Sequence, residues 1–148
     1  MRWKLAIVTT TALCATSTAC GGILSHGQAG AATSSRTAAA LTATDAENGH
    51  RITVHVGDRV SVVLRSTYWK FAGSSDAAVF TPVGSPTVSP SPSGCVPGQG
   101  CGTVTAAFLA VAPGTAQITA SRMSCGEALR CTGSAGSYRL AVTVKSSG

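Results

Sequence analysis

Charged side chains are scarce in this chain, and their scarcity limits the chemistry it can perform. Asp, Glu, Lys and Arg make up 11% of its 148 residues, against about 25% in ordinary soluble domains. Only five acidic residues and three histidines are present, so general acids, general bases and metal ligands are few. We therefore expect a protein that is not an enzyme, with no catalytic residue, no metal site and no cofactor.

Several sequence patterns that carry chemistry are also missing. The chain has no Gly-x-Ser-x-Gly nucleophile elbow and no glycine-rich loop that opens a helix to hold phosphate. Its formal net charge is +6, but no three basic residues are consecutive, so we expect no nucleic-acid partner. The apolar stretch over residues 5–19 is 15 residues long, too short for the ~20 residues that span a bilayer.

The N-terminal residues are typical of an export signal. Arg2 and Lys4 precede the uncharged segment 5–19, which ends in small residues, so residues 1–19 are predicted to be a cleaved signal peptide. The sequence Ser17-Thr18-Ala19-Cys20-Gly21-Gly22 resembles the lipobox of bacterial lipoproteins. That resemblance implies that Cys20 is the first mature residue and carries lipid, including palmitate, which anchors the protein at the extracytoplasmic face of the cell membrane.

A soluble product is the alternative. Lipoboxes usually carry Leu where this chain has Ser17, and Ser17-Thr18-Ala19 also satisfies the small-x-small rule for ordinary signal peptidase. The protein would then be secreted with Cys20 unmodified.

Residues 20–49 are rich in Gly, Ala, Ser and Thr and show no apolar periodicity. Such a segment buries too little surface to offset the entropy of ordering, so we predict a flexible tether. A short helix over residues 36–41 is the alternative.

Alternating apolar residues begin near Arg51 and continue to the C-terminus. This period of two predicts β-strands, and their number and spacing favour an all-β, Ig-like antiparallel β-sandwich of about seven strands over residues 50–148. A small barrel is the second possibility. The expected strands are 52–56, 59–64, 68–71, 78–80, 103–110, 116–121 and 138–145.

Two segments between these strands contain proline. The segment 81–102 holds five prolines, which predicts an excursion or an edge strand because proline cannot donate to a sheet ladder. Pro113-Gly114 predicts a tight turn, after which 116–121 is expected to pair back as a hairpin.

Four cysteines form two pairs with the same spacing. Five residues separate Cys95 from Cys101, and five separate Cys125 from Cys131, with each pair between expected strands. In an oxidising compartment this spacing predicts the disulfides 95–101 and 125–131, out of three possible connectivities. Zinc is the alternative, although structural zinc sites usually place cysteines closer together. The disulfides either stabilise a small domain or pre-organise a binding surface.

Three of the seven aromatic residues lie in Tyr68-Trp69-Lys70-Phe71. Trp69 is expected to enter the core, which would leave Tyr68 on the other side of the chain as a possible binding contact.

The strand and turn pattern over 52–64, 108–120 and 138–144 resembles bacterial Ig-like domains. It is also similar to the chagasin-type inhibitors of papain-like cysteine proteases, which are Ig-like sandwiches that act through three loops. In the first of those loops this chain has only 65–69 in place of Asn-Pro-Thr-Thr-Gly-Tyr, and the second is a proline-rich segment up to Gly102. In the third, Arg122 alone matches an Arg-Pro-Trp motif, which makes Arg122 a second possible binding contact.

These observations support two hypotheses about function. The first is an exported, membrane-anchored lipoprotein that presents a non-catalytic Ig-like domain to an unknown protein or cell-envelope partner. The alternative is a chagasin-like inhibitor of papain-family cysteine proteases.

Overall fold

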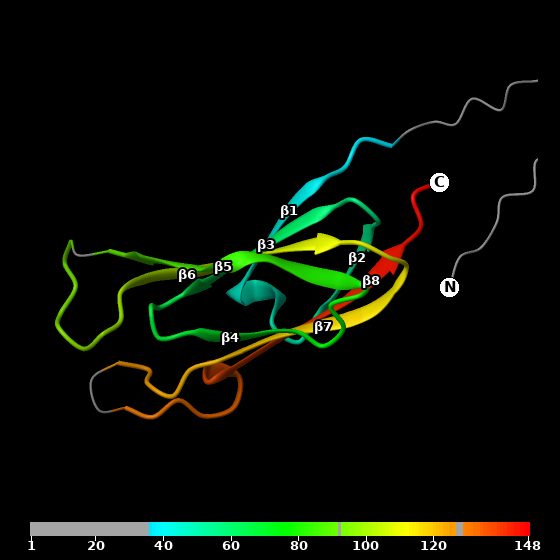
Figure 1. Cartoon of the computed structure of the whole chain (residues 1–148). Coiled ribbons are helices and arrows are strands. Elements are labelled where there is room, and N and C mark those ends of the chain that lie inside the picture. Colours follow the sequence, from blue (N-terminus) through cyan, green and yellow to red (C-terminus); the bar gives the residue numbers. More distant parts are fainter. Residues whose placement is uncertain (1–35, 92, 127–128) are drawn as a thin grey trace, which may run out of the picture. The chain divides into compact units, whose positions relative to one another are not determined.

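The computed structural model describes residues 36–91, 93–126 and 129–148, which form a sandwich of two four-stranded β-sheets (Figure 1). The predicted signal peptide, Cys20 and residues 20–35 of the predicted tether lie outside the described residues. Within the described ranges, no helix has the length and apolar character needed to cross a membrane.

Each sheet mixes parallel and antiparallel pairs. The first sheet has the order β1-β3-β6-β5 and the second β2-β8-β7-β4. β1 pairs with β3 in parallel and β2 pairs with β8 in parallel, whereas the remaining pairs are antiparallel. The strands are β1 (Ala40–Thr44), β2 (Arg51–His55), β3 (Arg59–Arg65), β4 (Lys70–Ser74), β5 (Phe80–Pro90), β6 (Gly102–Ala110), β7 (Gly114–Ser121) and β8 (Ser137–Lys145), with short 3-10 helices η1 (Asp45–Glu47) and η2 (Gly133–Ala135).

The core lies between the sheets, where the alternating apolar side chains meet. Val60, Val62 and Leu64 of β3 are fully buried, as every second residue of a strand with one inward face should be. Phe80 stacks on Phe108 at a centroid distance of 5.5 Å. The all-β sandwich is therefore confirmed. The antiparallel expectation holds for four of the six strand pairs, but β1 and β2 each add in parallel at one edge of a sheet.

The predicted tether is wrong for residues 40–47, which form β1 and η1. The alternative helix over 36–41 is also wrong, because Ala40 and Leu41 belong to a strand. In β1 only Leu41 and Ala43 face the core. One Leu in a segment of Ala and Thr gives too weak an apolar alternation to be recognised as a strand. The hydrogen bonds of β1 come from β3, a partner that composition cannot reveal.

Two short strand predictions were displaced along the chain. β4 begins at Lys70 instead of residue 68, and residues 77–79 form a turn before β5 begins at Phe80. β5 is an edge strand that contains Pro82, Pro86 and Pro90, so the prediction of an edge is confirmed for residues 80–90.

The predicted hairpin across Pro113-Gly114 is wrong. The chain does turn there, but β6 lies in the first sheet and β7 in the second, so the turn carries the chain from one sheet to the other. An alternating pattern shows which residues face inward, but it does not show which strand is the hydrogen-bonding partner.

Asp58 holds the start of the described chain against the sandwich. Its carboxylate is buried and accepts hydrogen bonds from both terminal nitrogens of Arg36, from Ala39 N at 2.8 Å and from His55 N at 2.9 Å. The Arg36 guanidinium is the main cause that lowers the pKa of Asp58 to about 2, and the two backbone donors add to it. The negative charge of Asp58 therefore stabilises the folded state.

Substitution of Asp58 by Asn should lower the free energy of unfolding at neutral pH by roughly 1–2 kcal/mol. Because the folded-state pKa is below the unfolded one, this stabilisation is complete above about pH 4 and is lost as the pH falls through about 2. Urea unfolding of both proteins between pH 7 and pH 2 measures the difference. Asp76→Asn, at an exposed turn, is the control and should change stability by less than about 0.5 kcal/mol. A deficit for Asp58→Asn that persists undiminished at pH 2 would contradict this role.

Candidate functional site at the loop end

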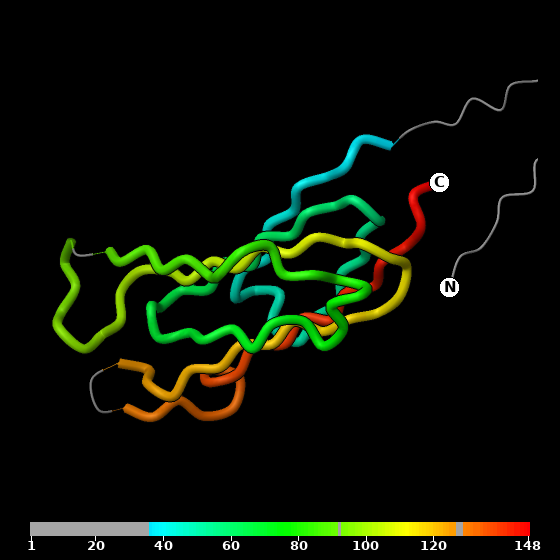
Figure 2. Tube along the Cα trace, in the orientation of Figure 1, coloured from blue at the N-terminus to red at the C-terminus, as the bar shows by residue number. Residues whose placement is uncertain are grey.

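Three connections between strands gather at one end of the sandwich (Figure 2). The first loop, residues 66–69, joins β3 to β4, and the second loop, residues 91–101, joins β5 to β6. The third loop, residues 122–136, joins β7 to β8 and includes η2. We call the surface formed by these three loops the loop end.

Disulfides close the second and third loops. Cys95 is bonded to Cys101 and Cys125 to Cys131, which confirms both predicted pairs. The third loop is also drawn together by backbone pairing, since Cys125 N donates to Leu129 O and Cys131 N donates to Met123 O. Each disulfide thus closes a small segment at the tip of its loop.

The first loop supports the second through Tyr68. The Tyr68 hydroxyl donates to Gly98 O at 2.8 Å, inside the disulfide-closed segment, and Thr67 N donates to Gly100 O at 2.8 Å. Gly100 has φ +64° and lies so close to the ring that a Cβ there would be 2.5 Å from Tyr68 Cδ2. Ser66 is the first residue of this loop and the one described non-glycine residue with a positive φ.

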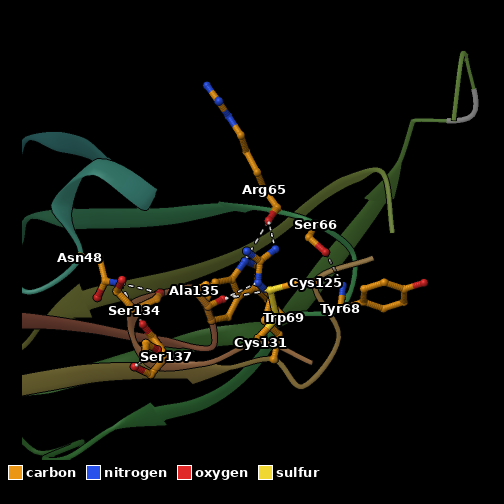
Figure 3. The surroundings of a disulfide bond; sticks show 12 residues. Asn48, Arg65, Ser66, Tyr68, Trp69, Cys125, Cys131, Ser134, Ala135 and Ser137 are labelled. Atoms are coloured by element: carbon orange, nitrogen blue, oxygen red, sulfur yellow. Dashed lines mark hydrogen bonds between the residues drawn. A yellow bond between two sulfur atoms is a disulfide. The ribbon is translucent and has the colours of Figure 1, made fainter. Parts of the chain in front are cut away.

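The next residue, Trp69, supports the third loop. Its ring is buried, which confirms the predicted core position, and its indole nitrogen donates to Arg65 O at 2.9 Å. The Arg122 guanidinium lies 4.7 Å from the centre of this ring and donates to Ala135 O at 2.7 Å. In Figure 3 the Tyr68 ring points away from Trp69 and from the Cys125–Cys131 disulfide.

The structure brings together the two contacts that the sequence suggested. Tyr68 and Arg122 both belong to the loop end, and both are half-buried with partners inside the protein. Contact of either residue with another molecule stays a prediction.

Sequence reasoning missed three exposed apolar side chains on the same surface. Met123 is 75% exposed, Leu129 is 67% exposed and Val96 is 49% exposed. A signal for two of them was present, because Val96 and Leu129 lie between paired cysteines. A side chain inside so small a closed loop has no interior to enter. Apolar groups grouped on one surface are typical of an interaction site.

Three hollows adjoin the loop end, and one of about 390 Å³ is lined mainly by the third loop. A groove of about 240 Å³ runs between Tyr68 of the first loop and Met123 of the third, with Lys70 and Arg122 also in its lining. A wider hollow of about 600 Å³ lies between η1 and the third loop and is lined in part by Trp69 and Tyr138. The buried Tyr138 hydroxyl has no hydrogen-bond partner among the described residues, and burial raises its pKa, so it stays protonated.

None of these hollows contains the groups of a recognisable catalytic or metal site. Within the described ranges, no three His, Cys, Asp or Glu side chains are placed to hold a metal ion. The four described cysteines are bonded as disulfides. The loop end is instead a surface of apolar and basic side chains held by disulfides and hydrogen bonds, and such a surface is suited to binding another macromolecule.

Comparison with known proteins gives likeness at the level of fold. No family model and no curated protein sequence matches the chain. The structure is similar to a crystal structure of the cysteine protease inhibitor EhICP2 from Entamoeba histolytica, with a TM-score of 0.50 and 14% identity over 72% of this chain and 97% of that one. It also matches the solution structure of amebosin, with a TM-score of 0.46 and 17% identity over 71% of this chain and 97% of that one. The likeness to EhICP2 shows a shared sandwich fold.

Substitution of Gly100 by Ala tests the packing of the second loop on Tyr68. Gly94→Ala is a matched control, because Gly94 also has a left-handed φ, +70°, but has open space where a Cβ would lie. The added methyl at residue 100 meets the Tyr68 ring, so Gly100→Ala should destabilise the protein by about 1–3 kcal/mol more than Gly94→Ala. It should also speed hydrogen exchange at the Thr67 amide. Equal effects of the two substitutions would show that the ring does not support this loop.

Proposed function

We propose that this protein is a non-catalytic inhibitor whose loop end binds the active-site cleft of a papain-family cysteine protease. The observation that supports this most is the grouping of three loops, two of them closed by disulfides, at one end of a sandwich. A second support is the fold that the chain shares with EhICP2, a protein described as a cysteine protease inhibitor.

The rigidity of the loops favours tight binding. Association costs less entropy when the contacting segments are already fixed, and protease inhibitors commonly move little when they bind. Here the hydrogen bonds of Tyr68 and Arg122 fix the loops from beneath, and Met123, Leu129 and Val96 are left exposed above them. Apolar contacts at the centre of an interface supply most of its free energy. We therefore assign the main apolar contacts to these three residues, and the positioning of the loops to Tyr68 and Arg122.

The contact residues differ from those of chagasin-type proteins. The first loop is only four residues long, and Met123-Ser124-Cys125 follows Arg122 where the motif has Pro-Trp. The disulfide-closed third loop takes the place of that motif as the segment presented to the partner. This chain would share with those inhibitors the placement of three loops at one end of the sandwich, but not the residues of their motifs.

Inhibition of a panel of papain-family proteases tests the proposal. The proteases should be activated and then freed of reductant, so that the two disulfides of the inhibitor stay intact. We expect competitive inhibition by the full-length, disulfide-bonded protein, and a loss of affinity of about tenfold or more for the double variant Met123→Ser, Leu129→Ser. Val111→Ser removes an exposed apolar side chain from the opposite end and should leave inhibition unchanged. Absence of inhibition at micromolar concentration would exclude these proteases as partners.

We also propose that the protein acts outside the cytoplasm, held to the membrane through lipidated Cys20. Two disulfides need an oxidising compartment, which supports export. Arg36 already contacts Asp58, so residues 21–35 would be the link between lipid and domain.

Expression in a bacterial host tests the anchor. The intact mass of the mature protein should include acyl chains, and Cys20→Ser should release the protein from the membrane fraction. An unmodified Cys20 at the N-terminus would favour secretion instead.

A further inference from the structure

The loop end carries an excess of positive charge. Arg65 ends β3 and Lys70 begins β4, while Arg122 and Arg130 belong to the third loop. None of these four side chains forms an ion pair with a described carboxylate. The ion pair between Arg36 and Asp58 lies at the opposite end of the sandwich.

The acidic residues offset this charge only in part. Glu127 belongs to the third loop, so the three loops and the strand ends beside them hold four basic residues and one acidic residue. Asp45 lies beside the loop end in η1, where its carboxylate accepts from Arg65 N, and Glu47 is engaged in the cap of the same helix. Asp76 belongs to the turn between β4 and β5, at the same end as Asp58. The partner therefore meets a net positive charge together with the exposed apolar side chains.

The groove between Tyr68 and Met123 also combines positive charge with an apolar lining. Its volume of about 240 Å³ gives room for a single side chain, and its lining is more apolar than polar. Lys70 and Arg122 bring two cationic groups to this groove. An acidic side chain would place its methylene groups against Tyr68 and Met123 and its carboxylate near the two cations.

We propose that the loop end recognises a protein surface on which carboxylates surround an apolar cleft, and that the groove between Tyr68 and Met123 seats one acidic side chain of that partner. The proposal rests on the proposed function and narrows it to papain-family proteases with an acidic rim around the cleft. Opposite charges steer association, and charges at the rim of an interface act mainly on the association rate. A nucleic acid fits less well, because the exposed apolar side chains have no counterpart in a phosphate backbone.

The experiment compares two charge reversals that change the net charge equally. Arg65→Glu with Arg130→Glu alters the loop end, and Arg59→Glu with Lys145→Glu alters exposed residues at the opposite end. The association rate is measured with two papain-family proteases chosen for acidic and for basic cleft rims, at about 20 mM and about 400 mM salt. The unaltered protein should associate faster with the acidic-rim protease.

The loop-end reversal should slow association with the acidic-rim protease about tenfold at low salt, and high salt should remove most of the difference. The control reversal should stay within about twofold of the unaltered protein. Equal effects of the two reversals, or no effect of either, would overturn the inference. Inhibition that is insensitive to charge would leave the proposed function intact.

If no protease is inhibited, peptide binding still tests whether the loop end recognises acidic protein segments. Isotope-labelled protein is titrated with a Glu-Leu-Glu-Leu-Glu peptide, with its Lys-Leu-Lys-Leu-Lys counterpart and with a short DNA strand. Amide shifts confined to residues 66–70 and 121–125, seen only with the acidic peptide, would support an acidic protein partner although the protease proposal has failed. Absence of such shifts, or equal shifts with DNA, would overturn the inference.

Discussion

Two adjacent aromatic residues that point in different directions determine how the loop end is built. Tyr68 donates to Gly98 O in the second loop, whereas Trp69 is buried beneath Arg122 of the third loop. The disulfides shorten their loops but form no bond to a neighbouring loop, so they do not place the loops against one another. The relative position of the three loops depends on this pair, on Arg65 O, which accepts from both Trp69 and Arg122, and on the bond from Thr67 N to Gly100 O.

Much of the fold follows from the sequence, because strand alternation depends on local burial. The inward residues of β3, β6 and β8 and the edge character of the proline-containing segment were predictable. Pairing partners were not, as the Pro113-Gly114 turn shows: the chain changes sheets there instead of forming a hairpin. β1 was missed for the same physical reason, since it is ordered by β3 and by the Arg36–Asp58 contact rather than by its own composition.

The disulfides and the burial of Trp69 were the parts of the site that could be predicted. Equal cysteine spacing indicated both disulfides, and Trp69 was correctly expected in the core. The contact of Arg122 with Trp69 joins residues far apart in the chain, and no local pattern encodes it. Exposure of Met123 depends likewise on how the third loop lies over the sandwich. The apolar and basic character of the loop end therefore emerges only when the three loops are placed together.

The central claim is that Arg122, packed on Trp69, holds the third loop in place. Hydrogen exchange at the Trp69 indole nitrogen and at the third-loop amides of an Arg122→Ala variant tests it most directly. Arg130→Ala is the matched control, because it removes an exposed guanidinium from the same loop. We predict that Arg122→Ala speeds exchange at these sites and lowers the free energy of unfolding by about 2 kcal/mol. Arg130→Ala should change neither the exchange rates nor the free energy of unfolding. Equal and small effects of both substitutions would contradict it.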